Sequence, residues 1–246
     1  MSGHSKWASI KHQKAIKDSR RGASFTKYAN LISGAASSGA DPATNFKLRL
    51  VVDSARKAGV PNVNIERAIK RGSGQDGSSS FEEIIYEGYG PGGVAIIVEA
   101  ATDNRNRTGP DIRSSFSKYG GSLGVSGSVA YQFTQRGELV IEAPDMELAE
   151  LDAIEAGAED VEEAEGELSV YTINTQLDAV RTKLSDKGYV VKSAQLSYEP
   201  SNTVKITDPK TAQTILKLID VLDDLDDVVN TYSNFDIDPE ILDASN

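Results

Sequence analysis

The segment RGSGQDGSSS, Arg71–Ser80, separates two parts of the chain that differ in charge and in periodicity. It is rich in Gly and Ser and almost free of apolar residues, which is typical of a linker. Residues 1–71 carry 14 Lys and Arg against 4 Asp and Glu, whereas residues 72–246 carry 12 against 33. The net charge of −11 therefore combines a basic leading part with a strongly acidic remainder.

Three helices are predicted before this linker. Their apolar residues recur every three or four positions in residues 25–36, 48–55 and 65–69. Asp41 followed by Pro42 predicts the start of the second helix, and Asn62 or Asn64 predicts the start of the third. Gly72 is expected to end the third helix. The short turn between the last two is compatible with a helix-turn-helix, although ordinary helix bundles have such turns too.

The chain begins with a basic arm, residues 5–21, that lacks a wide apolar stripe and is expected to lie against something else. Its cations have almost no acidic neighbours, so they would repel one another unless a phosphate backbone lay beside them. We predict phosphate contacts from Lys6, Lys11, Lys14, Lys17, Arg20, Arg21 and the nearby Lys27. The rings of His4, Trp7 and His12 could stack on bases, while Trp7 could instead pin the arm to the body.

After the linker, short strands alternate with amphipathic helices, which favours α+β layers over a doubly wound sheet. The segments SVAYQFT and GELVIEA flank a short turn and predict a hairpin. A helix beginning at Asp145 lies in the run from Gly137 to Val180, which holds 14 acids and no Lys or Arg. Asp208 and Pro209 predict the start of a last, long helix.

Two further groups of cations are candidates for phosphate binding. Arg105 and Arg107 follow a strand and precede a helix, where they could hold a phosphate or could serve in ordinary capping. In a helix-turn-helix, the third helix would present four side chains: Asn64, Arg67, Lys70 and Arg71. We therefore add Lys70, Arg71, Arg105 and Arg107 to the candidate nucleic-acid-binding residues.

Composition argues against several other classes of protein. A chain of 246 residues with 39% hydrophobic residues suits two or three domains with real cores. The chain has no Cys, so disulfides and thiolate metal sites are impossible, and we expect a cytoplasmic location. No run is apolar enough to span a membrane, and no leader peptide is predicted.

Catalysis has little support in the sequence. The only two histidines lie eight residues apart in the arm, and no nucleophile motif of the G-x-S-x-G type occurs. The acidic pairs lie in surface runs, where solvation is the usual explanation. We therefore predict no enzyme activity, no metal, no cofactor and no small-molecule substrate.

Several segments together resemble the YebC/PmpR family, which includes the mitochondrial translational activator of cytochrome c oxidase. They span nearly the whole chain in order: GHSKWASIKHQKA, RRGASFTKY, NIERAIKRG, YEGYGPGGVAIIVEAATDNRNRT, FSKYGGSLGVSGSVAYQF and DDVVNTYSNFDI. The family often has a His after the Arg at position 113, where this chain has Ser114.

The resemblance implies a three-domain α+β fold. A basic N-terminal helical bundle, residues 1–75, would precede two α+β domains of the ferredoxin-like sandwich type. The middle domain would combine residues 80–128 with residues 202–238, and residues 129–201 would form an acidic domain inserted in it.

The resemblance also implies a function in gene expression. Many members are described as probable transcriptional regulators that bind DNA, and others as ribosome-associated translation factors that relieve stalling at proline runs. We therefore expect a non-enzymatic regulator whose basic N-terminal domain grips promoter DNA. The alternative is a ribosome partner that binds ribosomal RNA or tRNA. In either case the acidic lobes are expected to be held away from the basic end.

Overall fold

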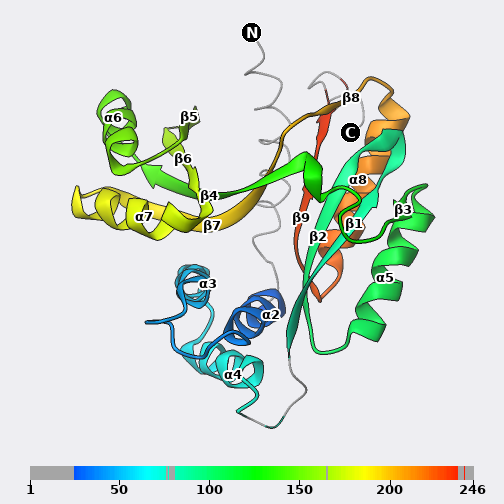
Figure 1. The fold of residues 1–246 in the computed structure, drawn as a ribbon, viewed down its shortest axis with the longest axis horizontal. Coiled ribbons are helices and arrows are strands. Elements are labelled where there is room, and N and C mark those ends of the chain that lie inside the picture. Colours follow the sequence, from blue (N-terminus) through cyan, green and yellow to red (C-terminus); the bar gives the residue numbers. More distant parts are fainter. Residues whose placement is uncertain (1–24, 76, 78–80, 165, 238–240, 242–246) are drawn as a thin grey trace.

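The computed structural model describes residues 25–75, 77, 81–164, 166–237 and 241 of the chain. Within these residues it is a mixed α/β fold with seven α-helices and two four-stranded antiparallel sheets. Figure 1 shows three packed groups of elements: a set of helices at the bottom and one sheet-and-helix layer on each side above it. The expected combination of a helical part with α+β layers is confirmed.

The helical group consists of α2 (Phe25–Ala36), α3 (Phe46–Lys57) and α4 (Asn62–Gly72). All three predicted helices are present. Their shared core includes Ile32, Leu48, Val52, Ile65 and Ala68.

The predicted start of the second helix was wrong by several residues. Asn45 caps α3, because its side chain accepts a hydrogen bond from Leu48 N at 3.0 Å. Asp41 instead closes the preceding turn, where its carbonyl accepts a hydrogen bond from Asn45 N at 2.8 Å. Both residue types are good helix caps. The helix begins at the second of them, Asn45, where Leu48 and Val52 then pack in the shared core.

The first sheet has the order β3-β1-β2-β9. Its strands are β1 (Glu82–Tyr89), β2 (Ala95–Thr102), β3 (Ser122–Leu123) and β9 (Val228–Ser233). Helices α5 (Arg105–Lys118) and α8 (Pro209–Asp224) cover one face. Side chains alternate along β2, so that Ile96 and Val98 pack with these helices while Ala95 and Ile97 point to the opposite face. A parallel pair, β8 (Val204–Ile206) and β10 (Phe235–Ile237), completes this group.

The second sheet has the order β5-β6-β4-β7. Its strands are β4 (Phe133–Glu142), β5 (Asp160–Ala164), β6 (Glu167–Ile173) and β7 (Val190–Pro200), with helices α6 (Met146–Ala156) and α7 (Leu177–Asp186). The predicted hairpin of SVAYQFT and GELVIEA was wrong, because β4 runs through the expected turn at residues 135–136 and on through Gly137 without turning. A Cβ at position 137 would lie 2.8 Å from Leu177 Cβ, so the glycine admits close approach of α7. Strand β5, inside the acidic run, was not predicted.

Three contacts join the three groups. Helix α2 packs against the face of the first sheet that α5 and α8 leave uncovered, and Asn30 Nδ2 donates to Asp226 O at 2.9 Å. The two sheets meet at a small apolar cluster, where the Tyr198 and Tyr232 rings lie edge to face with centroids 5.2 Å apart. The third contact, of α3 with α7 and the second sheet, combines ion pairs with the burial of Leu50 in the core of that sheet, and it bears on the candidate site.

Candidate nucleic-acid interface

Helix α4 presents two exposed cations that have no ion-pair partner among the described residues. Ile65, Ala68 and Gly72 face the helical core, and the spacing of three and four residues puts Arg67 and Lys70 on the outer side. Both side chains are exposed, and among the described residues neither has a hydrogen-bond or ion-pair partner. Asn64 lies beside them and is half-buried. These are three of the four side chains expected on a recognition helix.

The fourth, Arg71, has a structural position instead. Its Nη2 donates to Asn30 Oδ1 at 2.7 Å and its Nε donates to Ser33 Oγ at 3.1 Å. The guanidinium carbon lies 4.5 Å from the centroid of the Phe81 ring, a cation–π contact. Arg71 therefore ties α4 to α2 and to the segment that enters β1, and its donors are occupied within the protein.

Several other cations of the helical group also contact the protein itself. Lys27 Nζ donates to the Asp223 carbonyl at the end of α8, and Lys47 Nζ lies 2.6 Å from Glu83 Oε2 of β1. Lys57 Nζ donates to the Val191 carbonyl of β7 at 2.5 Å. These bonds hold the basic helices to the two sheets. The three ammonium groups are therefore already bound within the protein and are less available to a phosphate.

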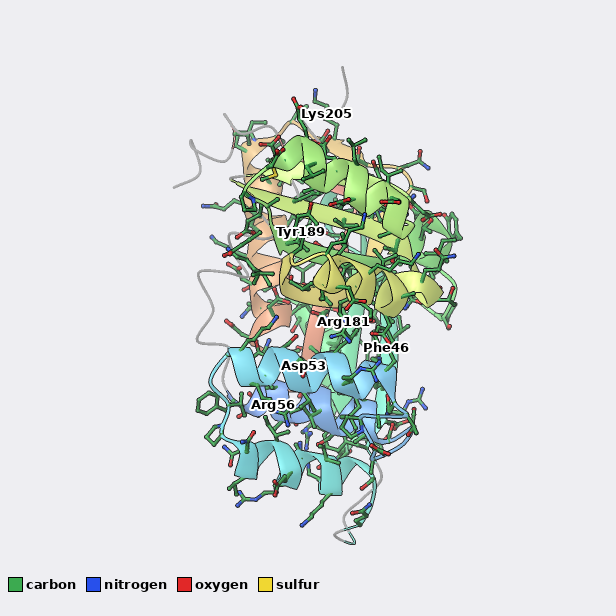
Figure 2. All side chains as sticks on the ribbon, turned by 90° about the vertical axis from the view of Figure 1, so that its left-hand side faces the viewer. Phe46, Asp53, Arg56, Arg181, Tyr189 and Lys205 are labelled. Carbon is green, nitrogen blue, oxygen red and sulfur yellow. The ribbon has the colours of Figure 1, made fainter. Side chains whose placement is uncertain are left out.

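Two ion pairs connect helices α3 and α7. Arg49 Nη2 of α3 lies 2.5 Å from Asp178 Oδ2 of α7, and Arg181 Nη1 of α7 lies 3.6 Å from Asp53 Oδ2 of α3. Figure 2 shows Asp53 and Arg181 on neighbouring helices, one above the other. The expectation that the acidic part is held away from the basic helices was wrong, because opposite charges on the two parts attract at this contact.

The predicted arm lies outside the described residues. This applies to His4, Lys6, Trp7, Lys11, His12, Lys14, Lys17, Arg20 and Arg21. Their assignment to phosphate, ribose or base contacts stays a prediction.

At the start of α5, the two predicted arginines have different surroundings. Asn104 caps the helix by accepting a hydrogen bond from Arg107 N at 3.2 Å. The Arg107 guanidinium grips both carboxylate oxygens of Asp227, at 2.9 and 2.8 Å, and Asp103 lies 3.3 Å away. The Asp227 hydrogen bond is the main cause that raises the pKa of Arg107. Arg107 therefore clamps α5 to the turn between α8 and β9.

Arg105, in contrast, is exposed and has no hydrogen-bond or ion-pair partner in the described part of the chain. It lies at one end of an open hollow of about 590 Å³ on the outer face of α5. Arg113 lies on the same face, two helical turns further along, and was not among the predicted site residues. The spacing i, i+4, i+8 that joins Arg105, Gly109 and Arg113 was visible in the sequence, but nothing there showed which face is outward.

The chemistry of both surfaces is that of anion binding. Guanidinium and ammonium groups beside amides and hydroxyls are the donors that phosphate groups recruit. In the described ranges, no group of three or more His, Asp or Glu is arranged to hold a metal ion. The same ranges include no helix with the length and apolar character of a bilayer-spanning segment.

The chain is similar to proteins of one family over nearly its full length. Residues 5–75 match the TACO1/YebC protein N-terminal domain, and residues 81–235 match the TACO1/YebC second and third domain. A probable transcriptional regulatory protein of Methylacidiphilum infernorum is 46% identical over 245 residues, covering 98% of each chain. One from Nostoc punctiforme is 49% identical over 247 residues, also covering 98% of each.

A solved structure has the same overall fold. A conserved hypothetical protein from Aquifex aeolicus superposes with a TM-score of 0.83 at 45% identity, covering 92% of this chain and 94% of that one.

Proposed function

The chain belongs to the TACO1/YebC family, and from that premise we propose that it is a non-enzymatic regulator of transcription that binds DNA through its basic N-terminal domain. Relatives that match nearly all of the chain carry the name probable transcriptional regulatory protein, which supports a regulatory role. A cytoplasmic location accords with this role and with the lack of Cys.

One observation carries the proposal: the helical group presents cations that no described residue neutralises. Lys27, Lys47, Arg49, Lys57 and Arg71 are each engaged with another part of the chain. Arg67 and Lys70 on α4 are exposed and have no ion-pair partner among the described residues, although acids outnumber cations in the chain as a whole. A phosphate backbone supplies the missing counter-charge and releases its own counterions on binding.

The N-terminal arm would extend this surface. Its cations, from Lys6 to Arg21, contact phosphates, and the rings of His4, Trp7 and His12 contact bases or sugars. Half or more of protein–DNA hydrogen bonds usually go to the backbone, so most of these contacts position the protein and only a few read sequence.

We further propose three domains, residues 1–75, 80–128 plus 202–238, and 129–201. Strand β9 pairs with β2 in the first sheet, although the strands of the second sheet lie between them in the sequence, which supports the division of the middle domain into two segments. The strand order β5-β6-β4-β7, with α6 and α7 as crossovers, supports a ferredoxin-like sandwich for residues 129–201. The first sheet begins with the β1–β2 hairpin, so its element order differs from that pattern.

The test is a binding titration of the intact chain with a labelled promoter duplex at several salt concentrations. The double variant Arg67→Gln/Lys70→Gln removes two phosphate contacts, so the slope of log K against log salt should become shallower by about 1.8. The control, Lys205→Gln/Lys210→Gln, removes the same charge elsewhere, and Figure 2 places Lys205 at the opposite end of the molecule from α4. An equal loss in both variants would show only a general charge effect and would contradict the α4 contact.

The same titration separates the two functions. Failure of the intact chain to retain any duplex at low salt would overturn DNA binding. Tighter retention of ribosomal particles than of duplex would replace the DNA regulator with a ribosome-associated translation factor.

A further inference from the structure

We propose that the hollow on the outer face of α5 holds the phosphate backbone of a nucleic-acid strand, as a second contact separate from the N-terminal domain. The inference rests on the proposed function, because it assumes that a nucleic acid is bound. Eight residues line the hollow: Tyr86, Arg105, Asn106, Gly109, Pro110, Arg113, Ser114 and Ser117. None of them is a carboxylate.

The two arginines are available for a ligand. Arg105 and Arg113 are exposed, and no carboxylate in the described part of the chain lies within ion-pair distance of either. Arg107, on the same helix, shows the contrast, since its guanidinium already binds Asp227 on two oxygens. An arginine with free donors in a fork geometry is the side chain best suited to a phosphate group.

Their spacing suits an extended polyanion better than a single anion. Eight residues of helix separate them, about 12 Å along the axis at 1.5 Å per residue. That distance corresponds to about three or four nucleotide steps of one strand at 3.4 Å each. Gly109 and Pro110 lie between the two arginines and are small, so the middle of the hollow is low and open.

The floor of the hollow holds a polar group without a partner. The Tyr86 hydroxyl is buried and makes no hydrogen bond within the described structure. A Cβ on Gly109 would lie 3.6 Å from this oxygen, so the hydroxyl lies directly beneath the glycine. Burial is the main cause that raises the pKa of Tyr86, which keeps the O–H protonated and able to donate. A phosphate oxygen seated over Gly109 after a small side-chain shift would satisfy it.

The scaffold beneath the hollow is rigid. Ile112 and Phe116 are fully buried against the first sheet, and the Arg107–Asp227 clamp fixes the first turn of α5. Both arginines therefore project from a fixed helix, which lowers the entropy lost when a ligand binds.

The experiment measures binding of the intact chain to a labelled single-stranded RNA and to a duplex across a range of salt. We compare wild type, Arg105→Gln/Arg113→Gln, and the control Lys118→Gln/Lys205→Gln. Lys118 belongs to the same helix, but its ammonium lies 5.5 Å from the centroid of the Tyr119 ring and outside the hollow. The arginine variant should bind about tenfold more weakly. For RNA, its slope of log K against log salt should become shallower by about 1.4, because two phosphate contacts are lost. Tyr86→Phe should weaken binding about twofold to fivefold with the slope unchanged.

The outcomes distinguish this inference from the proposed function. If wild type binds neither polymer, both the proposed function and this inference are refuted. If wild type binds, Arg67→Gln/Lys70→Gln weakens binding, and Arg105→Gln/Arg113→Gln behaves like the control, the α5 contact is wrong while the function stands. Competition by a poly-glutamate peptide as strong as that by an oligonucleotide of equal charge would show that the hollow accepts carboxylates in general, and would also overturn the inference.

Discussion

Replacing Glu87 with Gln tests how a buried carboxylate holds the loop between β3 and β4. Glu87 lies on β1 and is 5% exposed, yet it has no cationic partner among the described residues. Its oxygens accept hydrogen bonds from the backbone N–H groups of Gly127 at 2.7 Å, Val129 at 2.8 Å and Ala130 at 2.7 Å. The carboxylate therefore organises a loop that would otherwise bury unpaired donors.

The magnitude follows from these three bonds. In the variant, the amide oxygen can keep the two bonds from Val129 and Ala130, but the amide nitrogen then faces the N–H of Gly127. One charge-assisted bond is lost, worth about 1.5–3 kcal/mol, and one buried donor is left unsatisfied. We expect the free energy of unfolding to fall by about 2–3 kcal/mol, which lowers Tm by about 5–10 °C for a chain of this size.

The dependence on pH has a definite sign. Burial by itself would raise the pKa of Glu87, but the three backbone hydrogen bonds together outweigh it and hold the pKa below its ordinary value. The carboxylate therefore stabilises the fold above a pH of about 4.3, and this contribution is lost as pH falls through the lower folded-state pKa. The difference between wild type and Glu87→Gln should be constant near neutral pH and should shrink in acid.

Urea denaturation measures the stability difference, and hydrogen exchange locates it. The amides of Gly127, Val129 and Ala130 should exchange slowly in wild type and faster in the variant. Glu82→Gln is the control, because Glu82 lies on the same strand but is exposed. If Glu87→Gln changes stability by less than about 0.5 kcal/mol, as expected for the control, the reasoning about buried hydrogen bonds is refuted.

Two further changes test the contacts of the helical group. Gly72→Ala would place a Cβ in overlap with the Ser33 carbonyl oxygen and 2.6 Å from Ser33 Cα, so α4 should be displaced from α2 at a cost of about 1–3 kcal/mol in urea denaturation. Gly109→Ala is the control, because its Cβ would meet only ordinary contacts at 3.6 Å or more, and it should cost less. A reversed order of the two costs would contradict the packing of α4 on α2. A double-mutant cycle of Arg49→Ala and Asp178→Ala in urea denaturation should give a coupling free energy of about 0.5–1 kcal/mol that falls with added salt. A coupling of zero at low salt would mean that the α3–α7 ion pair does not help to hold the acidic part in place.

Local sequence features predicted most of the helices. In α8, Asp208 accepts a hydrogen bond from Thr211 N at 2.8 Å and Pro209 follows it, as the cap signal indicated. The stripe in residues 25–36 likewise forms one helix, α2. Capping and amphipathic periodicity act over a few residues, so these elements could be identified without knowing their partners.

Strand predictions failed where a residue serves a distant contact. A turn was predicted between SVAYQFT and GELVIEA, but β4 continues through this stretch, and the missing side chain of Gly137 lets α7 pack close to β4. An acidic stretch such as β5 has low strand propensity, yet it pairs with β6 because the sheet supplies its hydrogen bonds.

The sequence by itself determined the polarity of the molecule, a cationic leading part and an anionic remainder, because charge is a property of residue type. Only the tertiary structure decided which cations remain free. Arg107 meets Asp227 across 120 residues and Arg49 meets Asp178 across 129, whereas Arg67, Lys70, Arg105 and Arg113 have no such partner among the described residues. The physical reason is that an ion pair depends on a distance of a few ångströms in space, and folding sets that distance between residues far apart in the chain.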